Sequence, residues 1–105
     1  MTKREFLESY AEYVQRIRLK NQQSEGDLFP SIISKEIAEL EQRRRAVLEA
    51  IETAPEPEMR AILEARYINR LTVERTALQL GYSIRSIHRL TEKALKKMRF
   101  PADIE

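Results

Sequence analysis

One stretch in the last third of the chain decides the fold, and it reads Leu71-Thr-Val-Glu-Arg-Thr-Ala-Leu-Gln-Leu-Gly-Tyr-Ser-Ile-Arg-Ser-Ile-His-Arg-Leu90. Thr72 can cap a helix over 73–80, because its hydroxyl can accept hydrogen bonds from the free amides of the first turn. Gly81 can take the left-handed conformation that ends a helix at little cost. Ser83 can cap a second helix that runs to about Met98. The stretch therefore predicts two short helices joined by a tight turn.

The second of these helices has an apolar face and a basic face. Spacings of three and four residues predict a shared, buried face made of Ile87, Leu90, Ala94 and Met98. The opposite face carries Arg85, His88, Arg89, Glu92, Lys93 and Lys96. Arginine in the first turns suits base reading, because its guanidinium matches the two acceptors on a guanine edge. Cations further along the helix, up to Arg99, would lie near backbone phosphates.

This arrangement is typical of helix-turn-helix proteins, which place their second helix in the major groove of DNA. A hairpin with a glycine turn also occurs in all-α proteins that bind no DNA, and a basic helix face is often only solvated. Here both caps, the small Ala77, the Gly81 turn and the basic face are all in register, which favours DNA binding. The predicted DNA-binding residues are Thr72, Ser83, Ile84, Arg85, Ser86, His88, Arg89, Lys93, Lys96 and Lys97.

Several segments resemble region 4 of bacterial sigma factors. They are Pro57-Glu-Met-Arg-Ala-Ile-Leu-Glu-Ala-Arg-Tyr67, Leu71-Thr-Val-Glu74, Leu80-Gly-Tyr-Ser83 and Thr91-Glu-Lys-Ala-Leu-Lys-Lys-Met98. The resemblance covers about residues 56–99 and implies a helix-turn-helix that binds the promoter −35 element, together with a contact to the RNA polymerase β-flap. It places Ile84, Arg85 and Arg89 at base-reading positions, with Ser83 and His88 beside the backbone.

Over nearly its whole length, the chain resembles small bacteriophage proteins of a family of unknown function. That family is similar to the ArpU and RinA type regulators of phage late genes. That resemblance implies a phage origin and helices that precede the sigma-like module. Two positions depart from the sigma pattern. Thr76 stands where a large apolar residue is usual, which would weaken the core slightly. Ile84 stands where sigma factors commonly carry a polar or basic residue, so the −35 preference does not carry over.

Composition bounds the fold to an all-α protein. The 105 residues include only two glycines, and a third of them are charged. Residues 1–54 hold nine basic and ten acidic side chains, a net charge of −1, whereas residues 55–105 hold ten and seven, a net charge of +3. Between Gly81 and Phe100, six basic residues accompany a single glutamate. The positive charge is therefore concentrated on the predicted reading helix.

Other function classes find little support in the sequence. The chain has no cysteine, and its single histidine, His88, lies one turn from one carboxylate, Glu92, so neither a metal site nor general acid–base catalysis is predicted. No phosphate-binding glycine loop is present. We expect no enzymatic activity and no cofactor. The sequence has no apolar run of about 20 residues and no signal peptide. We therefore expect a cytoplasmic protein that does not bind or span a membrane.

Residues 1–54 predict a helical hairpin or a coiled-coil-like dimerisation element. One helix is expected over about 2–21 and another from Ser31 or Ser34 to Thr53, on either side of a non-helical connector bounded by Gly26 and Pro30. The second carries a heptad-like seam of Ile33, Ile37, Leu40, Val47 and Ile51, interrupted by Arg44. The seam would either pack within the hairpin or pair two copies in a homodimer, and the sequence favours neither.

The remaining boundaries follow from proline and apolar spacing. A third helix is expected from Pro57 to about Asn69, so residues 55–100 form the sigma-like module. Residues 101–105 are expected to be a frayed tail after Pro101.

The leading function is a sequence-specific regulator of transcription that binds double-stranded DNA with the helix at about 83–98. One alternative is a protein-interaction module that acts on RNA polymerase or a sigma factor without reading DNA. Another is the DNA-recognition subunit of phage packaging.

Overall fold

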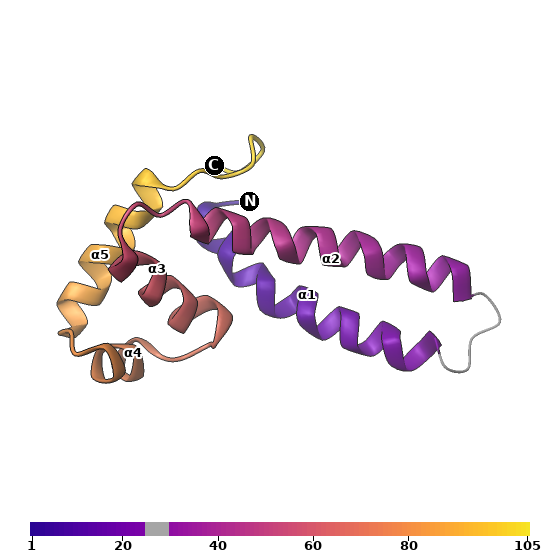
Figure 1. The fold of residues 1–105 in the computed structure, drawn as a ribbon, viewed down its shortest axis with the longest axis horizontal. Coiled ribbons are helices and arrows are strands. Elements are labelled where there is room, and N and C mark those ends of the chain that lie inside the picture. Colours follow the sequence, from indigo (N-terminus) through magenta and orange to yellow (C-terminus); the bar gives the residue numbers. More distant parts are fainter. Residues whose placement is uncertain (25–29) are drawn as a thin grey trace.

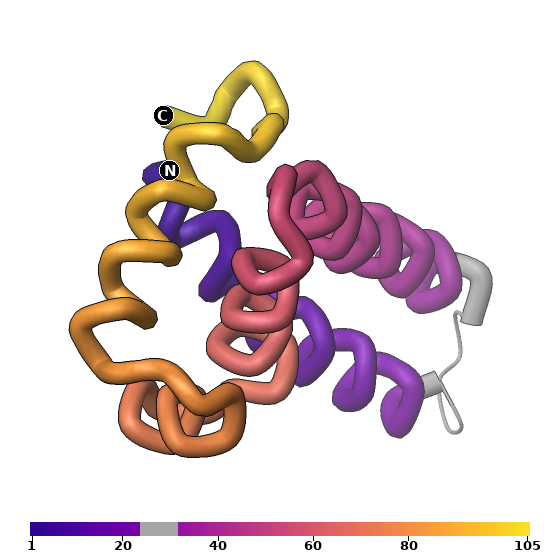
Figure 2. Tube along the Cα trace, turned by 60° about the vertical axis from the view of Figure 1, so that its left-hand side comes forward, coloured from indigo at the N-terminus to yellow at the C-terminus, as the bar shows by residue number. Residues whose placement is uncertain are grey.

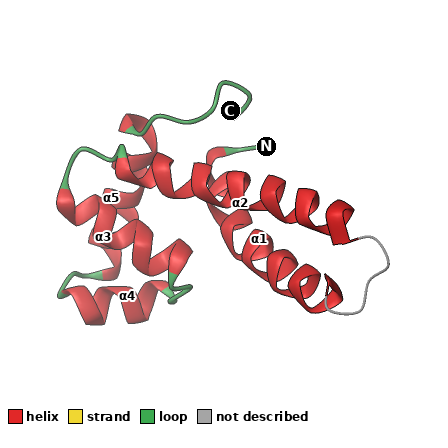
Figure 3. Cartoon of the chain, turned by 45° about the vertical axis from the view of Figure 1, so that its right-hand side comes forward, coloured by secondary structure: helices red, strands yellow, loops and turns green. Residues whose placement is uncertain are grey.

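Six helical elements follow one another in this computed structural model, which describes residues 1–24 and 30–105. In order they are α1 (Lys3–Ser24), α2 (Pro30–Glu52), α3 (Pro57–Leu63), η1 (Glu64–Ile68), α4 (Val73–Leu80) and α5 (Ile84–Lys97). Short non-helical segments join α2 to α3, η1 to α4 and α4 to α5, and the described residues form no strand (Figure 3). The protein is all-α, as the sequence predicts. Among these elements, none is both long and apolar enough to span a membrane.

The two long helices pack side by side as an antiparallel hairpin, and the three short ones with η1 form a second group at one end of it (Figure 1). The molecule is elongated, with extents of 52 × 30 × 20 Å. The termini lie close together where the two groups meet, since the amide of Glu105 donates to the carbonyl of Met1. The second group contains the stretch 71–90, and the hairpin packs against this group from one side.

The apolar seam of α2 is covered within the same chain. Ile33, Leu40, Val47 and Ile51 are buried, and Phe6 and Ile17 are buried on α1. The charged interruption also finds its partners inside the hairpin. Arg44 donates to Glu41 over 3.0 Å and to the Tyr10 hydroxyl over 3.5 Å. These hydrogen bonds raise the pKa of the Arg44 guanidinium, so the side chain stays charged where it is half-buried.

One apolar core extends from the hairpin into the second group. Leu7 of α1 is fully buried, and its cluster includes Ile51 of α2, Met59 and Leu63 of α3, and Leu95 of α5. A smaller cluster holds the decisive stretch together, with Ile62 of α3 packed against Ala77, Ile87 and Leu90. The pair of helices α4 and α5 therefore packs on α3, and α3 packs on the hairpin.

Two predicted boundaries are wrong. Residues 22–24, beyond the expected end of the first helix at about residue 21, continue α1 to Ser24, which is consistent with the good helix propensity of glutamine. Pro30, expected in the connector, opens α2, because a proline at the first helical position lacks only an amide that would be unpaired there. Most of the predicted connector, residues 25–29, lies outside the described residues.

The third helix changes its winding before it ends. It begins at Pro57 as predicted, but from Glu64 it continues as a π-helix, in which the amide of Asn69 donates to the carbonyl of Glu64. Arg70 follows with a φ of +58°, a left-handed conformation that is uncommon for a residue with a β-carbon. The amide of Leu71 then reaches back to the carbonyl of Ala65 and closes the turn.

The predicted frayed tail is also wrong. Phe100 packs edge-on against Phe6, with 5.8 Å between ring centres, and Ile104 is half-buried against the main core. The amide of Arg99 donates to the Thr53 hydroxyl over 2.8 Å. Pro101 ends the helical course, but apolar burial by Phe100 and Ile104 holds the chain against the hairpin.

Candidate nucleic-acid interface

Both predicted caps of the helix pair form. The Thr72 hydroxyl accepts from the amide of Arg75 over 3.1 Å and opens α4, and the Ser83 hydroxyl accepts from the amide of Ser86 over 3.1 Å and opens α5. Gly81 ends α4 with a φ of +78°, and its amide donates to the carbonyl of Ala77. The amide of Tyr82 donates to the same carbonyl. The turn is therefore held by backbone bonds that need glycine's left-handed conformation.

The buried face of α5 lies against α3 and α4. Its buried residues include Ile87, Leu90 and Ala94, as predicted, with Met98 directly after the helix. Two more buried residues, Thr91 and Leu95, were missed, and they widen the buried face to include neighbouring positions on the helix. The opposite face is left open to solvent.

The predicted DNA-binding residues lie at the exposed positions of this pair. Nine are exposed and Ser86 is half-buried, with its hydroxyl bonded to that of Ser83 over 2.9 Å. The exposed nine are Thr72, Ser83, Ile84, Arg85, His88, Arg89, Lys93, Lys96 and Lys97. Eight of the ten belong to α5, and they spread over the side of the helix that faces away from its buried residues, while Thr72 and Ser83 mark the starts of α4 and α5. Contact with DNA remains a prediction for each.

The two departures from the sigma pattern have different settings. Thr76 is fully buried, and its hydroxyl donates to the carbonyl of Thr72 over 2.8 Å, so the polar group in the core is satisfied. Ile84 is 45% exposed at the start of α5. An apolar side chain there offers contact to a thymine methyl group rather than a hydrogen bond to a base.

The single carboxylate on the exposed face of α5, Glu92, has a partner from another element. This face, which also carries Arg85, Arg89, Lys93 and Lys96, is called the reading face below. Glu92 forms a salt bridge with Arg4 of α1. The sequence suggested only its helix neighbour His88 as a partner, because spacing along one helix cannot reveal a side chain that arrives from elsewhere in the fold.

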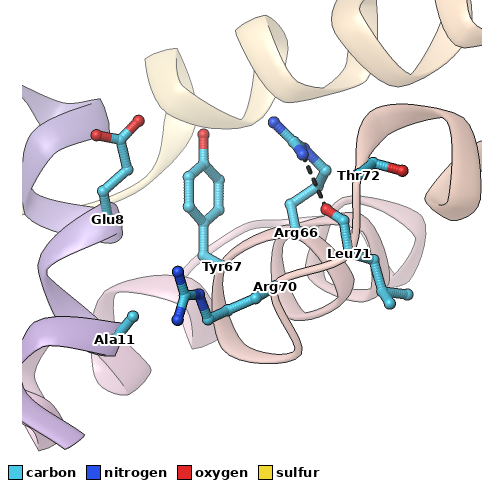
Figure 4. Close-up of a pocket in the computed structure, with 7 residues that line it drawn as sticks. All are labelled: Glu8, Ala11, Arg66, Tyr67, Arg70, Leu71 and Thr72. Carbon is cyan, nitrogen blue, oxygen red and sulfur yellow. Dashed lines mark hydrogen bonds between the residues drawn. The ribbon is translucent and has the colours of Figure 1, made fainter. Parts of the chain in front are cut away.

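A polar cavity of about 280 Å³ lies beside the start of α4. Figure 4 shows its lining, which comes from α1 with Glu8 and from the segment 66–72. Arg66 donates to the carbonyl of Leu71 over 2.9 Å, and its guanidinium lies 5.9 Å from the centre of the Tyr67 ring. Arg70 is exposed next to Thr72. These two arginines place positive charge near the α4 N-terminus, while Glu8 adds a carboxylate to the lining of the same pocket.

This pocket was not predicted from the sequence. Arg66 and Arg70 stand just before the Thr72 cap, but their placement depends on the π-helical turn of η1 and on the left-handed Arg70, which local spacing does not reveal. The left-handed Arg70 turns the chain so that this pair lies beside the cap.

Comparison with known families places the candidate interface in context. Residues 56–99 match the family model described as Sigma-70, region 4, a DNA-binding helix-turn-helix module. The match includes α3 to α5 and leaves α1 and α2 outside. No curated protein and no solved structure matches the chain. The predicted resemblance to sigma region 4 is thus confirmed over the module, and the resemblance to phage late-gene regulators stays a prediction.

Proposed function

We propose that this protein is a sequence-specific regulator of transcription, encoded by a phage and acting in the bacterial cytoplasm, that inserts α5 into the major groove of double-stranded DNA. The observation that carries the proposal is the exposed cationic face of α5, presented by a helix pair whose two caps and glycine turn are all formed. No catalytic activity and no cofactor are part of this proposal.

The shape and charge of the element agree with this role. A helix of 14 residues is about 21 Å long, enough to lie across a major groove. Arg85 and Arg89 stand near its start, where a recognition helix meets base edges, while Lys96 and Lys97 stand in its last turn. The arginines of the cavity beside Thr72 would add a phosphate contact at the start of α4.

Selection from random duplex DNA tests the proposal. Enriched sequences should share a motif, and binding to it should weaken steeply as salt rises, because cationic contacts release counterions from the phosphates. The symmetry of the motif would also show whether one or two modules bind. Absence of any enriched motif, together with salt-independent affinity, would contradict sequence-specific reading.

One observation favours a second function, a protein-interaction module acting on RNA polymerase or a sigma factor. Leu78 of α4 is 85% exposed, which leaves a large apolar side chain available to a partner protein. A pull-down of RNA polymerase subunits from nuclease-treated lysate, compared between the wild type and Leu78→Ser, would test this alternative. Capture that survives nuclease and is lost with the variant would support it.

A homodimer is also proposed, because two modules would roughly double the DNA site. The α2 seam no longer argues for it, since α1 covers that seam in the same chain. Sedimentation of the full chain at micromolar concentration, without DNA, measures the oligomeric state. A monomer in this measurement, together with a selected motif that lacks symmetry, would rule the dimer out.

A further inference from the structure

An ion pair joins the recognition helix to α1. The guanidinium of Arg4 and the carboxylate of Glu92 pair across elements that are far apart in the sequence, and their side chains are 46% and 57% exposed. An exposed ion pair of this kind adds little to folding stability. Its main consequence is therefore for the charge of the surface that carries it.

Glu92 is the only carboxylate on α5, and it lies among the cations of the reading face. It follows Arg89 by three residues and precedes Lys96 by four, so all three share one side of the helix. An unpaired carboxylate there would repel DNA phosphates and would draw the guanidinium of Arg89 away from a base. The reading face therefore depends on what neutralises this group.

Several contacts hold Arg4 in the position that reaches Glu92. Lys3 donates to the carbonyl of Leu95 over 3.0 Å and lies 5.4 Å from the centre of the Phe100 ring. Phe6 packs against the same ring. Figure 2 shows the start of α1, in indigo, beside the C-terminal part of α5. Because the residues on both sides of Arg4 are anchored, the start of α1 is held where the Arg4 guanidinium can reach Glu92.

We propose that Arg4 is a positioning residue for DNA binding, which holds the Glu92 carboxylate in an ion pair and so keeps the exposed face of α5 cationic. The inference rests on the proposed DNA-binding function. It extends the functional surface to α1, outside the segment that matches sigma region 4.

A double-mutant cycle in the full-length chain tests this role. Binding of a fluorescent duplex that carries the selected motif is compared for the wild type, Arg4→Ala, Glu92→Gln and the double variant. Arg4→Ala should weaken binding about two- to fivefold at low salt, the range of an exposed ion pair. The loss should shrink at higher salt, and it should vanish in the Glu92→Gln background, where no carboxylate remains to be neutralised.

Arg16→Ala is the matched control. Arg16 pairs with Glu12 on the same helix at similar exposure, 53% and 55%, but it lies about 18 Å further along α1. It should leave the affinity unchanged although it removes the same charge. Arg4→Lys should restore most of the binding, which a general loss of folding in Arg4→Ala would not allow.

The outcomes separate this inference from the proposed function. An equal loss from Arg4→Ala in both backgrounds would show that Arg4 contacts DNA itself and would overturn the role through Glu92. Unchanged binding by Arg4→Ala would overturn it as well. If the wild type shows no salt-dependent DNA binding at all, the proposed function fails, and this inference fails with it.

Discussion

Arg85 and Arg89 stand one turn apart on the exposed face of α5, where a bidentate contact to guanine is geometrically natural. Replacing either arginine with alanine should reduce the binding free energy for the selected motif by roughly 1–3 kcal/mol and relax specificity at the base pair that this arginine reads. The double variant Lys96→Ala/Lys97→Ala should instead weaken binding to the selected motif and to a scrambled duplex alike. It should also flatten the dependence of the affinity on salt concentration. Affinities for both duplexes measure this, and equal motif affinity in wild type and both arginine variants would contradict the assignment.

Gly81 gives a prediction about folding at the same scale. Its φ is +78°, and a β-carbon there would meet no atom within 4 Å, so substitution strains only the backbone. Gly81→Ala should lower the free energy of unfolding by about 1–2 kcal/mol, and Gly81→Asn should lower it less, because asparagine tolerates this conformation better. Urea denaturation measures both. Alanine as stable as glycine would mean that the turn relaxes out of the left-handed conformation.

At the scale of the elements, what could be predicted followed from local chemistry. The caps Thr72 and Ser83 and the turn at Gly81 depend on residues within one turn of each other, so the sequence specified α4 and α5 closely. The π-helical end of the third helix and the left-handed Arg70 were not predictable, because no glycine or asparagine occupies that position. The pocket beside Thr72 was missed for the same reason, because the left-handed Arg70 is part of its lining.

The start of α1 carries a pH-dependent cap. The amide of Thr2 donates to the Glu5 carboxylate over 2.9 Å, and the amide of Glu5 donates to the Thr2 hydroxyl over 3.2 Å, which together form a capping box. The bond from the Thr2 amide lowers the pKa of Glu5 below its ordinary value of 4.5. Because the folded pKa is depressed, the cap is fully formed at neutral pH and is lost as pH falls through that lowered value.

An NMR titration of the Glu5 carboxyl carbon checks this cap. The midpoint should lie below 4.5 in the wild type and should rise in Thr2→Pro, which removes the donating amide. Identical midpoints in the two proteins would mean that the carboxylate accepts no bond from Thr2 in solution.

For the whole molecule, the limit of sequence reasoning lies in contacts between distant segments. Periodicity indicated the apolar seam of α2, but it could not show that Leu7 of α1 would pack into the module, or that Phe100 would pack against Phe6. The Arg4–Glu92 pair is of the same kind. The division into a hairpin over 1–54 and a module over 55–100 therefore remains a prediction about independent folding, although one apolar core joins the two.

Leu7 tests whether the two parts fold as one unit. It is fully buried where α1 meets the module, so Leu7→Ala should destabilise the protein by about 2–5 kcal/mol. Because the cluster around Leu7 includes residues of α2, α3, η1 and α5, the whole chain should still unfold in a single transition, shifted to lower denaturant concentration.

Leu19→Ala is the control on the same helix. Its site is 49% exposed, so this variant should change the free energy of unfolding by no more than about 0.5 kcal/mol. Circular dichroism reports the helices, and the resolved ring NMR signals of Tyr67 and Tyr82 report the module. Two separated transitions, with only the helix signal moved by Leu7→Ala, would show that the hairpin folds independently and that the shared core does not couple it to the DNA-binding module.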